Sequence, residues 1–577
     1  MDISSRLALL REKMREKGLD GYIITSADPH MSEYVTAHYK CREFISGFSG
    51  SAGTVLVTAD SAFLWTDSRY FIQAAAQLRG SGIELMKMGE KDVPTLSAFI
   101  GERMKGQSVG ADCRTVTGRT AKALREVCDL HDEDLIREIW TDRPEPDTPY
   151  VEELDSAVCG ESRVERIARV REAMARIGAD HLIITACDEC AWLMDYRAFG
   201  VIYNPIPLAY AIVSADCVRL YVQGQLSDGL FEALMKDGVQ LEPYTRFMGH
   251  VSRLEGKVCA DSGQVSARIM GLLHDVTDIP SPVEMMKAVK TKAEQEGMTE
   301  AHIRDGAALT SFIRKVKGKC ADGTITSYTE LDAVADIERL RGEREGYLGP
   351  SFATIAAFGE HGAIVHYDPD EDTNIPCEGR SFLLVDTGGQ YMCGTTDVTR
   401  TISLGRLTDE ERRCYTAVLR GNLGLGAAVF PDRVTGANLD ALARTPIWEE
   451  GHDFGHGTGH GVGFISCVHE GPNAIRLRRA DTPFEEGMIT SNEPGIYLEG
   501  KFGVRLENLV LCRRREDDMM YFQTLTLAPF DMEAIVWDML TDREKRLLRE
   551  YHIRVYETLR PLLDEETAVW LKSYCEI

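Results

Sequence analysis

The chain has 577 residues, a net charge of −26 at pH 7 and a hydrophobic fraction of 44%, as expected for a soluble globular protein of roughly three or four domains. The negative charge argues against nucleic-acid binding, which needs clustered Lys and Arg to neutralise phosphates. No stretch approaches the ~20 apolar residues of a membrane helix, and the N-terminus lacks the apolar core of a signal peptide. We therefore expect a cytoplasmic protein with no nucleic-acid or membrane partner.

The cysteines support a reducing environment. There are fifteen, an odd number without the spacing of a disulfide framework, which is typical of free thiols in a cytosolic protein. Cys187 and Cys190 form a lone CxxC motif. Because a second pair and a cis-proline context are missing, we interpret them as two packed thiols rather than a redox or zinc site.

The front of the chain repeats itself. RLALLREKMREKGLDGYIITSADPH, from Arg6, aligns without a gap with RIARVREAMARIGADHLIITACDE, from Arg166. Each copy predicts an amphipathic helix, a stop at Gly18 or Gly178, and a short buried strand. An offset of 160 residues is far longer than a solenoid period, so we predict a duplicated domain. The polar, proline-rich segment 141–162 is expected to link the copies.

The second half predicts helices alternating with hairpins, as in an α+β domain. IPSPVE (279–284) opens a long helical stretch through Val316, with a break expected near Gly297 and one apolar face made by Leu309, Phe312, Ile313 and Val316. Further helices are expected at about 328–341, 408–428 and 436–449. The C-terminal helix opens with a capping box, Thr541 to Glu544, and stops before a proline. Its apolar face is either core or an oligomer contact.

Two aspartates lie in a predicted β-hairpin. SFLLVDTGGQYMCGTTDVTRTISLG contains two apolar runs around a Gly-Gly turn. A fold about Tyr391 and Met392 would set Asp386 directly opposite Asp397. Like charges facing each other across an antiparallel pair destabilise it.

Two glutamates repeat the arrangement. ITSNEPGIYLEGKFGVRLENLVL folds about Gly500 and sets Glu493 opposite Glu507. One facing pair of acids could arise from chance or poor register, but two in one domain need positive charge between them. A pair of divalent cations, with four charges against four carboxylates, is the simplest solution.

Five segments of the last third resemble the pita-bread metallopeptidases: HGAIVHY (361–367), VDTGG…TTDVTRT (385–401), GHGTGHGVG (455–463), VHEGP (468–472) and NEPGIY…VRLEN (492–508). Over its whole length the chain is similar to the three-domain cytosolic Xaa-Pro aminopeptidases, the aminopeptidase P family. DPHMSEY (28–34), FISGFSGSAGTVLVT (44–58) and LWTDSRYFIQAA (64–75) extend the resemblance to the front. It implies α/β N-terminal duplicated domains (1–155 and 156–282) and an α+β pita-bread C-terminal catalytic domain (283–577).

The resemblance implies a metal site of five ligands. Asp386 would bind one ion, Asp397 and Glu507 would bridge both, and His460 and Glu493 would complete the other. Carboxylates with one imidazole and no thiolate suit Mn(II), Co(II), Fe(II) or Zn(II) and exclude a structural cysteine-type zinc site. We expect two divalent metal ions, Mn(II) first, with Zn(II) or Co(II) as alternatives.

The resemblance also implies catalytic roles. Glu493 would take the proton of the attacking water and pass it to the leaving nitrogen. His366 and His469 would hydrogen-bond the substrate carbonyl and the developing gem-diolate. Sequence position, and not the resemblance, suggests a role for Arg505: it lies two residues before Glu507, on the same strand face, and could orient that bridging carboxylate.

Each residue has a simpler alternative. Any single acid here is more often a solvated residue at a strand end, and His366 could be a core histidine. The glycines around His456 might suggest a phosphate loop, but no Lys-Ser/Thr follows them. We expect His456 to support the site without binding metal, and His361 and Arg400 to be structural.

The predicted function is an Xaa-Pro aminopeptidase acting on proline-containing peptides, with a homodimer expected from the resemblance. A prolidase-type dipeptidase shares the five ligands, but typical prolidases have one N-terminal domain of this type, so the duplication favours the aminopeptidase. A catalytically inactive pita-bread module that binds peptides is the alternative from another class. The presence of all five ligand types argues against it.

Overall fold

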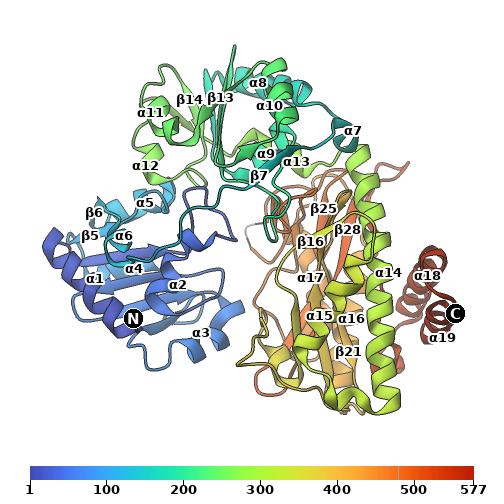
Figure 1. The fold of residues 1–577 in the computed structure, drawn as a ribbon. Coiled ribbons are helices and arrows are strands. Elements are labelled where there is room, and N and C mark those ends of the chain that lie inside the picture. The colour runs from blue at the N-terminus through green and yellow to red at the C-terminus, as the bar shows by residue number, and fades with distance from the viewer. Residues whose placement is uncertain (479, 577) are drawn as a thin grey trace. The chain divides into compact units, whose positions relative to one another are not determined.

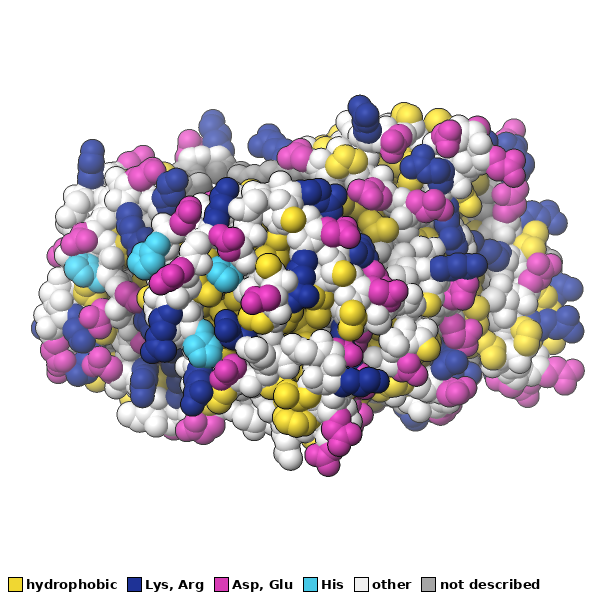
Figure 2. All heavy atoms as spheres, turned by 90° about the horizontal axis from the view of Figure 1, so that it is seen from above, with side chains coloured by type: hydrophobic (Ala, Val, Ile, Leu, Met, Phe, Trp, Pro, Cys, Tyr) yellow, Lys and Arg dark blue, Asp and Glu magenta, His cyan; other side chains and the backbone are white. Residues whose placement is uncertain are grey.

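The computed structural model describes residues 1–478 and 480–576, which form two compact units (Figure 1). Unit 1 comprises Met1–Ser156, Glu161–Val201 and Ile206–Glu284, and unit 2 comprises Ala157–Gly160, Ile202–Pro205 and Met285–Ile577. No helix in the described ranges has both the length and the apolar character of a membrane span. On the face seen in Figure 2, Lys and Arg side chains are interspersed with Asp and Glu.

Unit 1 contains the same sheet twice. The first sheet has the order β4-β3-β2-β1-β5-β6 and the second β13-β11-β10-β8-β14-β15. The pairing directions agree between the two sheets. β1–β2 and β2–β3 in the first sheet, and β8–β10 and β10–β11 in the second, are antiparallel, and the other three pairings of each sheet are parallel. The strands are β1 Gly21–Thr25, β2 Thr54–Thr58, β3 Ala62–Thr66, β4 Glu84–Lys87, β5 Ser108–Ala111, β6 Asp129–Asp132, β8 His181–Ile184, β10 Ala209–Ser214, β11 Val218–Val222, β13 Val239–Pro243, β14 Val258–Ala260 and β15 Val276–Asp278. The predicted duplication is confirmed.

The leading helices of the two copies also match. α1 (Ile3–Lys17) and α8 (Arg163–Ile177) both end at a glycine in the left-handed conformation, Gly18 with φ 68° and Gly178 with φ 71°. Only glycine adopts this backbone without strain, which explains the two predicted stops. The unit's other helices are α2 Cys41–Ser46, α3 Phe71–Gln77, α4 Leu96–Arg103, α5 Gly118–Arg125, α6 Leu135–Ile139, α9 Cys187–Met194, α10 Asp228–Lys236, α11 Phe247–Val251 and α12 Ala267–Met270.

The segment expected to be a linker is partly ordered into elements. It contains β7 (Tyr150–Glu153) and α7 (Ser156–Cys159). β7 pairs with β12 (Gln225–Leu226) and β9 (Tyr196–Arg197). Composition alone indicated a loop, whereas this strand forms because two other short strands offer it backbone partners.

Unit 2 opens with two helices whose break differs from the prediction. α13 (Pro282–Ala288) is followed by α14 (Lys292–Asp322), which begins at a capping box between Thr291 and Glu294 and runs through Gly297 without interruption. A Cβ at Gly297 would lie 2.5 Å from the Cys393 carbonyl oxygen. The glycine therefore allows close packing against the helix rather than ending it.

A three-stranded sheet lies against α14 and α15 (Glu330–Gly342). It has the order β17 (Ile355–Phe358), β18 (Phe382–Thr387), β21 (Val398–Ser403). The predicted apolar face of α14 is buried against Leu383 and Val385 of β18, and Figure 1 shows α14 running the length of the unit. Because side chains alternate along a strand, Asp386 points to the opposite face of β18.

A six-stranded antiparallel sheet, in the order β22-β29-β28-β25-β23-β24, supplies the other side of the site. Its strands are β22 Val429–Phe430, β23 Gly459–Gly461, β24 Glu470–Ile475, β25 Ile489–Asn492, β28 Asn508–Arg514 and β29 Met520–Thr524. α16 (Asp409–Gly426) and α17 (Gly436–Glu449) cover it. The C-terminal helix α18 (Asp542–Leu559) buries Leu548, Tyr551, Val555 and Leu559 in a core with α16, so its apolar face is core. α19 (Glu565–Tyr574) follows.

The two acid-bearing ribbons have different registers. β26 (Gly495–Leu498) pairs with β27 (Phe502–Arg505), and Asn492 faces Asn508, so Glu493 and Glu507 lie opposite each other as predicted. The other ribbon, which β18 and β21 form and which we call the aspartate ribbon, has a different register from the one predicted, because Asp386 faces Thr399 and not Asp397.

The cause lies in the tip of the aspartate ribbon. There β19 (Gly389–Tyr391) pairs with β20 (Gly394–Thr395), and these two strands belong to a separate sheet with β16 (Tyr347–Pro350). The turn is formed by Met392 and Cys393, one residue later than predicted. A one-residue displacement of a turn moves every cross-strand partner by two, so the two aspartates are diagonal neighbours on one face.

Candidate metal centre

Five acidic and imidazole side chains meet where strands of unit 2 begin or end. Their positions are Asp386 in β18, Asp397 just before β21, His460 in β23, Glu493 just after β25 and Glu507 just before β28. Backbone hydrogen bonds fix the two glutamates, since Glu493 N–H donates to the Thr458 carbonyl at 2.8 Å and Glu507 N–H to the Thr399 carbonyl at 3.1 Å. Strands far apart in sequence thus present one cluster.

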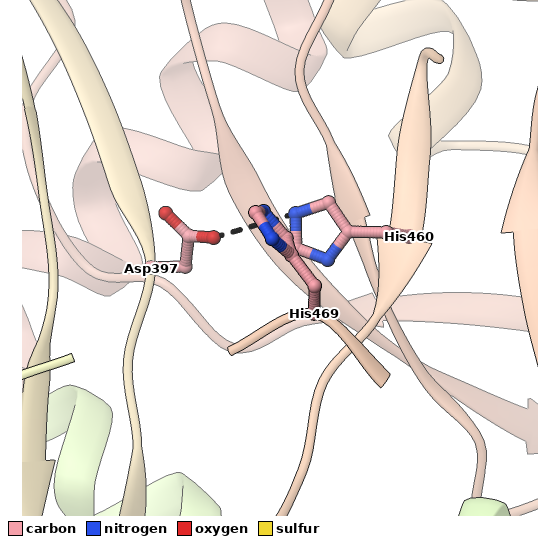
Figure 3. Close-up of side chains that lie close together, drawn as sticks. All are labelled: Asp397, His460 and His469. Atoms are coloured by element: carbon pink, nitrogen blue, oxygen red, sulfur yellow. Dashed lines mark ion pairs between the residues drawn. The ribbon is translucent and has the colours of Figure 1, made fainter. Parts of the chain in front are cut away.

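The cluster forms three overlapping groups whose potential ligand atoms lie within 4.8 Å of one another. They are Asp386, Asp397 and Glu507; His460, Glu493 and Glu507; and Asp397, His460 and His469. His460 Nε2 is 3.4 Å from both Asp397 Oδ2 and Glu493 Oε1, and the first of these ion pairs is drawn in Figure 3. Asp397 and Glu507 each belong to two of these groups, as expected of carboxylates shared by two adjacent metal ions.

His460 is presented in the form that binds metal. Its Nδ1 lies 2.9 Å from the Gly461 carbonyl, which accepts a hydrogen bond only from a protonated Nδ1. In the neutral imidazole this leaves a lone pair on Nε2, the atom that faces Asp397 and Glu493. Gly459, one residue earlier, packs tightly, since a Cβ there would lie 2.0 Å from the Ser491 carbonyl oxygen. This glycine serves strand packing and not phosphate binding.

Positive charge is needed among these carboxylates. Burial and then neighbouring carboxylates raise the pKa of Glu507 well above its usual value. Burial raises the pKa of Asp386 and of Glu493 as well, although the Arg505 and His460 cations oppose this. Burial lowers the pKa of His460, but the hydrogen bond to Asp397 and the nearby carboxylates outweigh it and raise the pKa to about 9. Asp386 Oδ1 is buried without a hydrogen-bond partner. These features fit two divalent cations.

Arg505 contacts a different acid from the one predicted. Its Nε and Nη2 donate to Asp386 Oδ2 at 3.1 and 2.6 Å, and the other hydrogen bonds of the guanidinium go to Thr399 Oγ1, Tyr497 Oη and the Val365 carbonyl. β27 lies along β21, where Arg505 N–H donates to Thr401 Oγ1 at 3.2 Å, and this directs the guanidinium to the end of β18. Glu507 Oε2 instead accepts from Thr399 Oγ1 at 2.8 Å. The expectation that Arg505 orients Glu507 is therefore wrong.

The two histidines expected at the substrate carbonyl differ in placement. The His469 ring is perpendicular to that of His460 with centroids 4.4 Å apart, close enough to share a metal group with it (Figure 3). His366 is half-buried in the turn that follows the 3-10 helix Gly359–Ala363 and belongs to none of the three groups in the described chain. The preceding carbonyl, of Val365, accepts from Arg505 Nη2 at 3.2 Å, which ties this turn to the acid cluster.

Sequence reasoning did not identify Tyr497 as part of the site. Its hydroxyl lies 2.8 Å from Arg505 Nη1 and 2.8 Å from His456 Nε2, so it connects Asp386 through Arg505 to His456. His456 Nδ1 in turn is 3.9 Å from Glu493 Oε2. The position of Tyr497 in the sequence could have indicated this role, because Tyr497 and Arg505 lie on the paired strands β26 and β27, next to the two glutamates.

His361 and Arg400 have structural contacts, as expected. His361 Nδ1 lies 2.9 Å from Glu330 Oε1, away from the acid cluster. Arg400 is buried and donates to backbone carbonyls, including that of Glu507 at 2.6 Å and that of Ala528 at 2.9 Å. Arg400 thereby joins the backbone of a proposed ligand to the C-terminal region.

The family is decided by sequence comparison. A model of metallopeptidase family M24 matches residues 296–514, and a model of the C-terminal region of that peptidase matches 518–577. Two models of the creatinase/prolidase N-terminal domain match 6–139 and 142–294. A Laccaria bicolor protein named "Probable Xaa-Pro aminopeptidase P" is 36% identical over 605 residues, covering 100% of this chain and 94% of the relative. The chain belongs to metallopeptidase family M24.

Solved structures agree with this M24 assignment. The X-prolyl aminopeptidase of Caenorhabditis elegans, described as a cytosolic enzyme with a di-nuclear active site, matches with a TM-score of 0.95 at 30% identity, over 100% of this chain and 99% of that one. A prolidase from Thermococcus sibiricus shares the fold over 64% of this chain and 98% of its own, with a TM-score of 0.51 at 23% identity. The chain is thus a metallopeptidase, a hydrolase with duplicated N-terminal domains and a pita-bread catalytic domain.

Proposed function

We propose that this M24 metallopeptidase is an Xaa-Pro aminopeptidase, which removes the N-terminal residue from peptides with proline at the second position. The observation that carries the proposal is the set of three overlapping ligand groups in unit 2. The full-length similarity to relatives named for this activity supports the substrate.

The ligands we assign to two divalent ions are Asp386, Asp397, His460, Glu493 and Glu507. Their oxygens and one imidazole nitrogen suit Mn(II), which we propose as the native metal, with Zn(II) and Co(II) as alternatives. When bound, such ions supply Lewis acidity, which lowers the pKa of the attacking water and polarises the scissile carbonyl. Arg505 positions Asp386 through its two hydrogen bonds to Oδ2.

Glu493 is the proposed general base and acid. Its Oε1 accepts a hydrogen bond from Ser491 Oγ at 3.1 Å, which holds the carboxylate toward the cluster. A pKa raised by burial suits a group that must take a proton from water and return it to the leaving nitrogen. For an Xaa-Pro bond that nitrogen belongs to proline and must be protonated before it departs.

His366 and His469 are the proposed donors to the substrate carbonyl. As its oxygen gains negative charge on attack, an imidazole N–H stabilises it more than it stabilises the ground state. The short separation of His469 from His460 supports this position for His469. For His366 the support is the hydrogen bond between its turn and Arg505.

The direct test is Glu493→Gln with Arg-Pro-Pro as substrate. We expect loss of hydrolysis by at least a factor of ~100, the lower end of general acid–base contributions, with an unchanged circular dichroism spectrum. Glu499→Gln, in the exposed turn before β27, is the matched control and should keep full activity. Full activity in Glu493→Gln would refute the proposed mechanism.

A prolidase-type activity is the closest alternative. Arg-Pro and Arg-Pro-Pro compared at equal concentration distinguish the two, because a prolidase cleaves the dipeptide and an aminopeptidase prefers the longer peptide. Preferential cleavage of the dipeptide would contradict our proposal. A peptide-binding module without activity would cleave neither after reconstitution with Mn(II), Zn(II) and Co(II) in turn.

The proposal also covers the domain bounds, the cellular location and the partners of the protein. We infer domains 1–155, 156–282 and 283–577, supported by the repeated sheet of unit 1. We further propose a cytoplasmic homodimer that acts on peptides and binds neither nucleic acid nor membranes. The net charge of −26 and fifteen free cysteines support this setting.

A further inference from the structure

Asn422 is a polar side chain buried in the core of unit 2. It lies in α16 and is 2% exposed, and the helix residues around it, including Leu419, Leu423 and Leu425, are buried and apolar. Asparagine is disfavoured inside helices and in apolar surroundings, because its amide needs hydrogen-bond partners there. The partners of this amide therefore show what the residue contributes.

The Asn422 amide contacts the backbone just before each glutamate of the metal centre. Its Nδ2 donates to the carbonyl of Asn492 at 2.9 Å and to the carbonyl of Leu506 at 3.0 Å. Asn492 directly precedes Glu493, and Leu506 directly precedes Glu507. One side chain thus joins the two places at which the backbone enters a proposed ligand.

The two peptide groups that lead into the glutamates are held at both ends. Their carbonyls accept from Asn422. Their N–H groups are those of Glu493, which donates to the Thr458 carbonyl at 2.8 Å, and of Glu507, which donates to the Thr399 carbonyl at 3.1 Å. Because a peptide group is planar, bonds to its oxygen and to its nitrogen together fix its orientation. They also fix the direction in which the following glutamate side chain leaves the backbone.

The glutamates need this support because they lie between two strand ladders. The pairing of β25 with β28 ends at Asn492 and Asn508, and the pairing of β26 with β27 starts at Gly495 and Arg505. Cross-strand pairing thus covers the residues on either side of the two glutamates. The hydrogen bonds from α16 and from the segments beside this ribbon hold the stretch in between.

The position and the orientation of the amide are themselves fixed. Asn422 Oδ1 accepts from Asn508 Nδ2 at 3.4 Å, and the backbone carbonyl of Asn422 accepts from Asn492 Nδ2 at 2.8 Å. Turning the amide over would place its oxygen against two carbonyl oxygens, so the contacts require its nitrogen to face them. Asn422 and Asn492 therefore join α16 to the end of β25 by two reciprocal bonds, each from a side chain to the carbonyl of the other residue.

We propose that Asn422 is a positioning residue of the metal centre, which fixes Glu493 and Glu507 relative to each other. The two carboxylates form one ligand group with His460, and the role rests on their proposed assignment as ligands. Without the amide, each glutamate keeps its N–H bond, but the peptide group before it loses one of its two restraints. Metal affinity then falls, because partners that orient metal ligands typically contribute a factor of about 10–100. Catalysis also slows, because Glu493 is the proposed general base.

Asn422→Leu in the full chain tests this role, because leucine keeps the number and the branching of the heavy atoms and has no donor. We expect the Mn(II) dissociation constant, measured by competition with a chromophoric chelator, to rise about 10- to 100-fold. At saturating Mn(II), kcat for Arg-Pro-Pro should fall at least ~10-fold while KM stays within about twofold. If circular dichroism shows that Asn422→Leu does not fold, the same expectations apply to Asn422→Ala, which removes the amide and favours the helix.

Thr416→Val is the matched control. Thr416 is buried on the same helix, and its hydroxyl accepts from the Val536 N–H at 2.9 Å, a bond to the C-terminal region. Valine keeps the shape and loses this bond, so the variant should be less stable in urea while its Mn(II) affinity, kcat and KM stay unchanged. Wild-type Mn(II) affinity in the folded Asn422 variant, or an equal loss of affinity in Thr416→Val, would overturn the positioning role.

Glu493→Gln separates this role from the proposed function. If Glu493→Gln loses hydrolysis while the Asn422 variant keeps wild-type Mn(II) affinity and kcat, the function stands and the positioning role is refuted. If Glu493→Gln keeps full hydrolysis, the proposed function fails, and the positioning role fails with it.

Discussion

Replacing Arg505 by lysine tests how the protein prepares its metal site. The guanidinium is 2% exposed and makes five hydrogen bonds, two of them to Asp386 Oδ2. Lysine keeps the charge but cannot reproduce this planar fork, so Asp386 loses its fixed orientation and the link to Tyr497 is broken. Losing a partner that orients a metal ligand typically weakens metal binding 10–100-fold. That factor corresponds to about 1.4 to 2.7 kcal/mol.

The assay is competition for Mn(II) against a chromophoric chelator at neutral pH. We expect the Arg505→Lys dissociation constant to rise by that factor while the circular dichroism spectrum stays unchanged. Arg513→Lys is the matched control, because Arg513 lies on β28 and binds the neutral side chains of Gln295 and Gln523. Wild-type Mn(II) affinity in Arg505→Lys, or an equal loss in Arg513→Lys, would refute the reasoning.

Three further predictions follow from individual contacts. Gly297→Ala should destabilise the chain by about 1 to 3 kcal/mol in urea denaturation, because the added Cβ would meet a backbone carbonyl. Gly318→Ala, on the same helix, adds a Cβ that meets nothing within 4 Å and should stabilise the chain by about 0.5 to 1 kcal/mol. Equal effects of the two changes would contradict the packing argument. In the metal-free chain the pKa of His460 is raised from 6.5 to about 9, so the stability that its proton provides is complete below pH 6.5 and is lost as pH rises to about 9. The melting temperature of the metal-free protein should fall across that pH window. The increase in melting temperature on adding Mn(II) should become larger across it, because the metal replaces the proton on His460. An increase that does not depend on pH would argue against His460 as a ligand. Tyr551→Phe removes the hydroxyl that accepts from the Ala528 N–H at 3.2 Å. The change leaves this buried donor unpaired and should cost about 1 to 3 kcal/mol in the same urea assay; an equal loss in Tyr556→Phe, on the same helix, would contradict this.

Local sequence signals predicted the elements that carry the site. The ungapped repeat that starts at Arg6 and Arg166, with a glycine stop after each helix, predicts the duplicated front. Gly500 marks a turn with φ 71°, and the register that it sets brings Glu493 opposite Glu507. Where one residue determines the turn, the cross-strand pairing can be read from the sequence.

Features set by tertiary contacts could not be read in this way. The sequence predicts a fold of the aspartate ribbon about Tyr391 and Met392, but the turn forms at Met392 and Cys393, where β20 packs against α14. The sequence predicts a helix break at Gly297, but this glycine is a point of close packing, and the helix begins at the capping box between Thr291 and Glu294. The partner of Arg505 depends on β27 lying along β21, which no local pattern encodes.

The most direct test of the central claim is the number of metal ions per chain that activity requires. Metal-free protein is titrated with Mn(II) while bound metal is counted by mass spectrometry and Arg-Pro-Pro hydrolysis is followed in the same samples. We expect no hydrolysis without metal, full activity at two ions per chain, and loss of the second ion in Asp397→Asn. Hydrolysis that persists in the metal-free protein, or Asp397→Asn that keeps two ions and full activity, would contradict a dinuclear centre built from these five residues.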